Sequence, residues 1–284
     1  MPAPNWIRLL LWLIGVAAGL YGLIVALLYC FQSALIYHPA RGAEPELIDL
    51  AHGLNLAPWR SRQGEIIGWQ AASPRGLPSG RPAYRLLVFH GNAGFALDRD
   101  QILRGFEQLN HGFTWEVFLF EYPGYGSRPG QPGEAAITQA AAAAFAELQA
   151  ADDRPIYLLG ESLGSGPACA LARAHGSEIA GLMLITPFSR LADAADYHYP
   201  WLPVRLLLRD RWDNLAALRG FHGRFACLLA GNDQTTPTAE GRSLFASVSS
   251  PKQLWVQPNA THNTINYSFS AAWWREASDF LTGR

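Results

Sequence analysis

The sequence has little charge and almost no lysine. Charged residues make up 16% of the 284 positions, the net charge is −1, and Lys252 is the only lysine. No block of like charges occurs along the chain. Because proteins that bind nucleic acids need clustered basic residues to neutralise phosphates, this composition argues against a nucleic-acid partner.

Cysteine is scarce as well. The three cysteines, Cys30, Cys169 and Cys227, are too few and too scattered for a disulfide framework. Neither a CxxC pair nor a cluster of histidines and cysteines has the spacing of metal ligands. We therefore expect no metal and no other cofactor, and we interpret Cys169 and Cys227 as small buried apolar residues.

Charge is missing altogether from one long stretch near the N-terminus. Residues 9–31 are roughly 23 positions without a charge, enough at ~1.5 Å per residue to cross a ~30 Å hydrocarbon core. Trp6 and Tyr37 flank the stretch, as interfacial aromatic residues do. A cleaved signal peptide is the alternative, but no good A-x-A cleavage site is found. We predict that residues 1–38 form an uncleaved, single-pass anchor in a lipid bilayer.

The orientation and association of this anchor are less well defined. Arg8 and Arg41 flank it almost symmetrically, so the positive-inside rule gives little guidance. The short N-terminal tail favours a main domain outside the cytoplasm. Gly15 and Gly19 form a G-x-x-x-G pair, which is either a helix-dimer face or the ordinary glycine content of membrane helices. The oligomeric state therefore stays open.

Beyond the anchor, residues 39–284 alternate between short apolar runs and helical stretches. Eight runs indicate strands: 54–60, 65–71, 85–89, 115–120, 156–159, 181–185, 225–230 and 254–256. Helical patterns cover residues 97–109, 135–150 and 165–175, whereas residues 32–58 are expected to be a connector. Because short apolar runs between helices are typical of buried parallel strands, we predict an α/β fold. Its mostly parallel sheet has about eight strands flanked by helices.

The alternation breaks between residues 187 and 223. This segment is too long for a simple crossover and too apolar for a free loop, and it contains Tyr197 and Trp201. We interpret it as a small helical cap over a binding site. An ordinary crossover helix with extra surface turns is the alternative.

The stretch Gly160-Glu161-Ser162-Leu163-Gly164 lies between a predicted strand and a predicted helix. A G-x-S-x-G sequence in this position is typical of a nucleophile elbow, in which a tight turn lifts the serine hydroxyl clear of the sheet. The glycines are needed because side chains there would collide with the neighbouring strand or helix. The alternative is a glycine-rich turn before a buried helix.

A serine nucleophile needs a base, and the base needs a carboxylate to orient it. Asp233 and His262 follow the last two predicted strands, in the chain order Ser, Asp, His that accompanies such an elbow. We predict Asp233 as the orienting acid and His262 as the base. His90 and Asp193 are the alternatives for the base and the acid respectively.

A tetrahedral oxyanion requires two hydrogen-bond donors. The backbone N–H of Leu163, immediately after the serine, is the first candidate. The loop at residues 90–94 supplies the second, for which we choose the N–H of Asn92, with that of Ala93 as the alternative. Tyr125, on the loop after the next strand, is a candidate for lining the pocket.

Five motifs occur in the order found in a known superfamily: HGNAG (90–94), YPGYGS (122–127), GESLG (160–164), GND (231–233) and THN (261–263). From about residue 35 to the C-terminus the chain resembles the α/β-hydrolases, near the membrane-anchored serine hydrolases of the Bem type. Relatives often carry an asparagine where this chain has Phe95, which affects only the entrance of the pocket.

The resemblance implies a membrane-anchored serine hydrolase with the triad Ser162, Asp233 and His262. Such an enzyme cleaves carboxylic or thio-esters through an acyl-enzyme, and here we expect apolar acyl chains. We expect Phe95, Tyr197 and Trp201 to line the pocket with Tyr125. A serine peptidase of the same fold and a catalytically inactive membrane-tethered scaffold are the alternatives.

Overall fold

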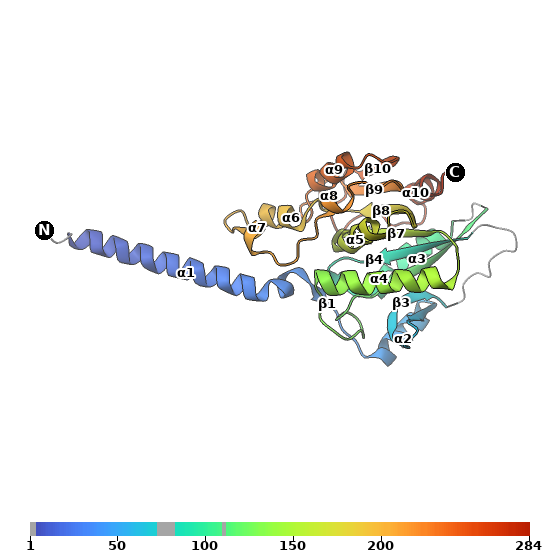
Figure 1. The fold of residues 1–284 in the computed structure, drawn as a ribbon, viewed down its shortest axis with the longest axis horizontal. Helices are drawn as coiled ribbons and strands as arrows, with labels where there is room; N and C mark the ends of the chain where they lie inside the picture. The colour runs from blue at the N-terminus through green and yellow to red at the C-terminus, as the bar shows by residue number, and fades with distance from the viewer. Residues whose placement is uncertain (1–3, 73–82, 110–111) are drawn as a thin grey trace.

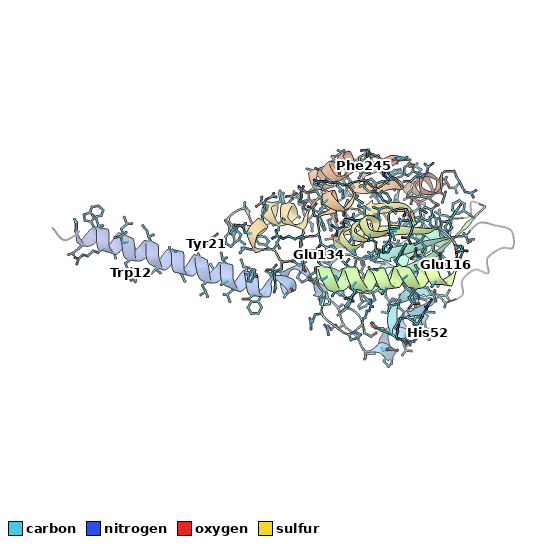
Figure 2. All side chains as sticks on the ribbon, viewed as in Figure 1. Trp12, Tyr21, His52, Glu116, Glu134 and Phe245 are labelled. Atoms are coloured by element: carbon cyan, nitrogen blue, oxygen red, sulfur yellow. The ribbon has the colours of Figure 1, made fainter. Side chains whose placement is uncertain are left out.

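The computed structural model describes residues 4–72, 83–109 and 112–284. Its first element, helix α1 (Asn5–Ile36), projects from the rest of the chain, and side chains such as Trp12 stand free around it (Figures 1 and 2). By length and composition α1 could cross a membrane: its most apolar window has a mean hydropathy of 2.3 and is not buried. Its 32 residues extend ~48 Å, which exceeds a ~30 Å hydrocarbon core by about three turns.

The central sheet has eight strands in the order β10-β9-β8-β7-β4-β6-β3-β2. All neighbours are parallel except the pairs β2–β3 and β3–β6. The prediction of a mostly parallel eight-stranded sheet is therefore confirmed. The strands are β2 (Leu56–Arg60), β3 (Ile66–Ala71), β4 (Ala83–Phe89), β6 (Thr114–Phe120), β7 (Ile156–Glu161), β8 (Ile179–Ile185), β9 (Arg224–Ala230) and β10 (Lys252–Gln257).

Helices cover both faces of this sheet and bury an apolar cluster on each (Figure 1). One face packs against α4 (Glu134–Ala151), α5 (Ser165–His175) and α9 (Thr238–Ser247). The other packs against α2 (Glu44–Gly53), the short helix η1 (Ala96–Arg99), α3 (Asp100–Glu107) and α10 (Trp273–Thr282). Because successive strands end at the same edge, their following loops lie close together there.

The expectation of a connector over residues 32–58 is wrong. Helix α1 continues to Ile36, and α2 forms within the same segment. Pro45 lies in the first turn of α2, where its missing N–H does no harm, and the helix buries Leu47 and Ala51. The prolines and glycines that suggested a connector therefore mark the boundaries of a short helix.

Between β8 and β9 the chain forms three short helices, α6 (Leu191–His198), α7 (Val204–Leu207) and α8 (Asn214–Ala217). We call residues 187–223 the cap segment. Figure 1 shows α6 and α7 on the side of the molecule from which α1 projects. The segment is helical, as expected, but it exposes Trp201 (53%) and Leu206 (82%) at its tip.

The end of α1 is joined to the body of the molecule by Tyr37. Its hydroxyl donates a hydrogen bond to Asp210 (2.6 Å) and accepts one from the indole N–H of Trp212 (3.0 Å). Burial and the Asp210 carboxylate raise the pKa of Tyr37 well above its usual range. Tyr37 therefore stays neutral and keeps its donor. Next in the chain, β1 (His38–Pro39) pairs in parallel with β5 (Ala93–Gly94).

Candidate active site

Ser162 lies in a strained turn between β7 and α5. Its φ of 53° is in the left-handed region that non-glycine residues rarely adopt. A Cβ at Gly164 would lie 2.1 Å from the Phe89 carbonyl oxygen, and one at Gly160 would lie 2.5 Å from the Gly164 carbonyl oxygen. Both glycines are therefore sterically required, as the sequence predicts for an elbow.

Ser162, His262 and Asp233 form a continuous hydrogen-bonded row. The Ser162 Oγ is 2.9 Å from His262 Nε2, and His262 Nδ1 is 2.7 Å from Asp233 Oδ2. These neighbours are compatible with the imidazole tautomer in which Nδ1–H donates to Asp233 and Nε2 accepts from the serine hydroxyl. Three residues from three separate loops are thus assembled in the order needed for proton transfer.

Asp233 is held by the turn that follows it. Its Oδ1 accepts hydrogen bonds from the backbone N–H groups of Thr235 (2.9 Å) and Thr236 (3.0 Å). The Thr236 hydroxyl lies between Thr186 O (2.9 Å), Asp233 Oδ2 (3.1 Å) and His262 Nδ1 (3.2 Å). With its side chain only 2% exposed, Asp233 is an acceptor of fixed orientation beside the imidazole.

The two alternative residues have other partners. His90 is buried, its Nδ1 lies 2.8 Å from the Gly91 carbonyl oxygen, to which it can only donate, and its ring stacks on Tyr122 at 4.0 Å between ring centroids. Asp193 pairs with Arg190 (3.2 Å) and Arg205 (2.6 Å) within the cap segment. The geometry therefore favours His262 and Asp233 over these alternatives.

Glu161, immediately before the serine, links the elbow to the segment that follows His262. Its carboxylate accepts hydrogen bonds from the Tyr267 hydroxyl (2.8 Å) and from Nε of Arg99. Burial alone would lower the pKa of Arg99, but the Glu161 carboxylate outweighs it and the net shift is upward. Arg99 therefore stays charged, and Glu161 links the turn of Ser162 both to Arg99 and to Tyr267, five residues after His262.

The glycine-rich loop after β4 passes close to the serine. A Cβ at Gly91 would lie 3.8 Å from the Ser162 Cβ. The Asn92 carbonyl accepts hydrogen bonds from the Tyr125 hydroxyl (2.7 Å) and the His38 N–H (2.9 Å), and the Asn92 amide side chain donates to Ile36 O (3.2 Å). The Leu163 N–H lies in the first turn of η2 (Ser162–Gly164), where helical geometry provides no acceptor. Asn92 and Leu163 are thus both placed beside Ser162.

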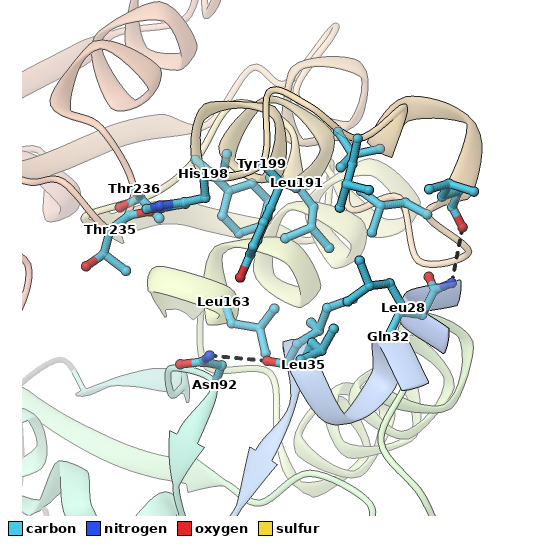
Figure 3. A pocket seen from close by; sticks show the side chains of 18 of the residues that line it. Leu28, Gln32, Leu35, Asn92, Leu163, Leu191, His198, Tyr199, Thr235 and Thr236 are labelled. Carbon is cyan, nitrogen blue, oxygen red and sulfur yellow. Dashed lines mark hydrogen bonds between the residues drawn. The ribbon is translucent and has the colours of Figure 1, made fainter. Parts of the chain in front are cut away.

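A pocket of about 370 Å³ opens next to Ser162, within the ~300–1,000 Å³ typical of small-molecule sites. Figure 3 shows its lining: Leu163 and Asn92 at the base, Leu191, His198 and Tyr199 from the cap segment, and Leu28, Gln32 and Leu35 from α1. His198 Nε2 is also 2.9 Å from Thr235 O, which joins the cap to the loop of Asp233.

The four residues predicted to line the pocket are not among those that surround this cavity. Tyr125 is fully buried beneath Asn92, and Phe95 precedes η1 and packs in the core on the α3 side of the sheet. Tyr197 and Trp201 point outward from the cap, 56% and 53% exposed. For Tyr197 the correction follows from helical phase, because α6 turns Ala194, Ala195 and His198 toward the pocket instead.

Sequence reasoning missed the contribution of α1 to this site. Leu28, Tyr29, Gln32, Leu35 and Ile36 all line the pocket. The spacing 28-32-35 is that of one helical face, and Gln32 is a polar residue just beyond the apolar run. A polar glutamine at this point of an otherwise apolar helix was the sequence signal that this end of α1 contacts the rest of the protein.

A family model described as alpha/beta hydrolase fold matches residues 84–275. An uncharacterised protein of Mycobacterium tuberculosis is 31% identical over 244 residues, 84% of this chain and 83% of the relative. The lysophosphatidylserine lipase ABHD12 of Danio rerio is 27% identical over 73% of this chain and 57% of its own length. The protein bem46 of Schizosaccharomyces pombe is 28% identical over 66% of this chain and 63% of its own length.

Solved structures share the fold at low sequence identity. An esterase of Pyrococcus furiosus superposes with a TM-score of 0.59, 14% identity, 87% of this chain and 98% of its own. A bacterial membrane phospholipase A superposes with a TM-score of 0.56 and 16% identity, covering 98% of both chains. At such identities the likeness concerns the fold.

Proposed function

Because the chain belongs to the α/β-hydrolase fold family, we propose that it is a serine hydrolase that cleaves carboxylic or thio-esters with apolar acyl chains. The observation that carries the proposal is the hydrogen-bonded row from Asp233 through His262 to Ser162, with both separations between 2.7 and 2.9 Å. Lipases and esterases among the similar proteins support the same class of activity.

In this mechanism His262 acts first as a base. Its Nε2 accepts the proton of Ser162 while Oγ attacks the acyl carbonyl, and Asp233 stabilises the resulting imidazolium. The N–H groups of Leu163 and Asn92 stabilise the oxyanion. His262 then protonates the leaving alcohol or thiol, and a water molecule activated by the same imidazole hydrolyses the acyl-enzyme.

The chemistry of the pocket supports an apolar acyl group. None of the described residues that line it is Asp, Glu, Lys or Arg. Leucine, alanine and valine make up half of the lining, and the polar groups lie near the serine, on α1, and at His198 and Tyr199 of the cap segment. Burying a charged acyl substituent there would be unfavourable because no counter-charge lines the cavity.

We also propose that residues 1–38 are a single-pass anchor and residues 39–284 the hydrolase domain. The length and hydropathy of α1 support the anchor.

The decisive experiment is labelling with a fluorophosphonate probe combined with ester hydrolysis. Ser162→Ala should lose labelling and reduce turnover ~10⁴-fold or more, whereas Ser243→Ala, on the exposed face of α9, should match the wild type. Turnover that survives in Ser162→Ala would reject the proposed nucleophile.

The same preparation tests the other candidate classes. A p-nitrophenyl acyl ester and an aminoacyl anilide are compared with the wild-type protein. Faster cleavage of the anilide would indicate a peptidase, and absence of both labelling and turnover would indicate an inactive scaffold.

A further inference from the structure

One wall of the pocket beside Ser162 is the end of α1 itself. Leu28, Gln32 and Leu35 line the cavity at helical spacing, and Leu191 of the cap segment lies across it (Figure 3). Leu202 and Leu207 of the cap segment line the same cavity. The last turns of α1 therefore form part of the cavity in which the acyl group is proposed to lie. The helix that could enter a bilayer is thus also part of the proposed substrate site.

Gln32 attaches this wall to the cap. Its amide N–H₂ donates to Leu207 O (3.1 Å), and its carbonyl oxygen accepts from the Arg209 N–H (2.8 Å). Gln32 is the only buried residue within α1. A buried amide whose donor and acceptor are both used fixes the separation of the two elements it joins.

The tip of the cap lies alongside a more N-terminal part of α1. The Tyr21 hydroxyl donates to Trp201 O (3.0 Å), and the two rings meet edge to face at 6.5 Å between centroids. Arg209 stacks on Tyr29, with its guanidinium 5.5 Å from the ring centroid. Exposed tryptophan, tyrosine and arginine side chains along these last turns of an apolar helix are typical of a membrane–water interface.

These contacts place the pocket relative to a bilayer. Tyr21 and Trp201 lie at the same level of α1, and the pocket wall begins two turns further along the helix, at Leu28. With the N-terminal turns of α1 in the hydrocarbon core, the pocket lies at the surface where lipid ester bonds are found. Leu206, 82% exposed on the cap tip, then faces lipid and not water.

We propose that the cavity between α1 and the cap is an acyl-binding groove that receives one acyl chain of a membrane lipid directly from the bilayer, and that α1 determines which chain lengths fit. The proposal rests on the serine hydrolase function above. The acyl chain moves along the leucines of α1 until its ester carbonyl reaches Ser162, and the polar headgroup remains on the water side.

The first test measures chain-length preference with p-nitrophenyl esters from butyryl to dodecanoyl. Leu28→Trp should narrow the groove and lower the ratio of dodecanoyl to butyryl kcat/KM by about tenfold or more. Leu28→Ala should widen the groove and move the optimum to longer chains. Leu27→Trp is the matched control, because Leu27 is exposed on the same turn and does not line the pocket, and it should leave the ratio unchanged.

The second test measures the route of entry. The full-length protein is placed in phosphatidylcholine vesicles, and a fluorogenic diacyl phospholipid is supplied either in the same vesicles or in separate ones. Because such lipids exchange slowly between vesicles, turnover should be at least tenfold faster when enzyme and substrate share a bilayer.

Two results would overturn the groove. Either unchanged ratios in both Leu28 variants, or an equal shift in Leu27→Trp, would show that α1 does not contact the chain. Equal turnover from separate vesicles would reject entry from the bilayer. Fluorophosphonate labelling of each variant keeps these outcomes separate from the serine hydrolase function, which fails only when wild-type protein is not labelled at Ser162.

Discussion

At the scale of single residues, the catalytic proposal depends on which carboxylate faces the imidazole. Asp233 Oδ2 is hydrogen-bonded to His262 Nδ1, whereas Asp193 is engaged by Arg190 and Arg205. Asp233→Asn should therefore reduce kcat by about 10⁴-fold, because an amide favours the wrong imidazole tautomer. Steady-state hydrolysis of a butyryl ester measures the loss.

Asp193→Asn is the matched comparison for this prediction. It weakens ion pairs within the cap but leaves the imidazole contact intact, so its loss of kcat should be far smaller. Circular dichroism spectra of both variants establish that they are folded. A larger kcat loss in Asp193→Asn than in Asp233→Asn would transfer the orienting role to Asp193.

At the scale of elements, the link between α1 and the cap depends on Gln32. Replacing it with leucine removes both hydrogen bonds and leaves the Leu207 carbonyl and the Arg209 N–H without their partner. Because both hydrogen bonds are only partly buried, water replaces part of what is lost, and the cost stays below the ~1–3 kcal/mol of a fully buried group. We expect Gln32→Leu to loosen the groove, raising KM for dodecanoyl esters more than for butyryl esters.

Ser33 provides the control, because it is the next residue on α1 and is exposed. Ser33→Leu should leave both KM values within a factor of about two of the wild type. Limited proteolysis of the cap segment gives a second readout that does not depend on turnover, and it should be faster only in Gln32→Leu. Equal proteolysis rates in the two variants would contradict the role given to Gln32.

The sequence predicts the elements of this fold better than their contacts. Strands such as β7 are recognisable because they are short, almost fully buried apolar runs, and the elbow because Gly160, Ser162 and Gly164 have a fixed spacing with a steric cause. Helix α2 was missed because Pro45 suggested a turn, although a proline in the first helical turn is well tolerated.

The pocket could not be predicted in the same way. Which side of α6 faces inward depends on how the cap docks, so Tyr197 and Ala194 could not be distinguished from their spacing alone. The approach of α1 to the cap joins Gln32 to residues about 175 positions away. Long-range contacts of this kind are set by tertiary packing, which local patterns do not record.

At the scale of the whole molecule, the reactivity of two buried cysteine thiols measures unfolding of the hydrolase domain. Burial raises the pKa of Cys169 and Cys227 above the ordinary value of 9.0, whereas Cys30 is exposed on α1. At pH 8 a maleimide should leave Cys169 and Cys227 of the native protein unmodified, because the reactive species is the thiolate. Mass spectrometry of intact protein before and after unfolding in guanidinium counts the modified sites.

The raised pKa values of these two thiols determine how the stability of the folded protein changes with pH. A group whose pKa is higher in the folded state contributes stability that is fully present below the unfolded value and is lost as pH rises above it. The contribution of the two thiols therefore declines above about pH 9. Modification of Cys169 at a rate independent of unfolding would contradict the buried placement.

The continuity of α1 has a kinetic consequence. The helix runs without interruption from its apolar N-terminal turns to Ile36, and β1 then pairs directly with β5 beside Ser162. With no flexible joint in between, a bilayer-embedded α1 keeps the catalytic face at one height and one tilt above the lipids. Encounter with substrate then becomes a search in two dimensions, in which the rate follows the surface density of esters in the leaflet and not their concentration in the surrounding water.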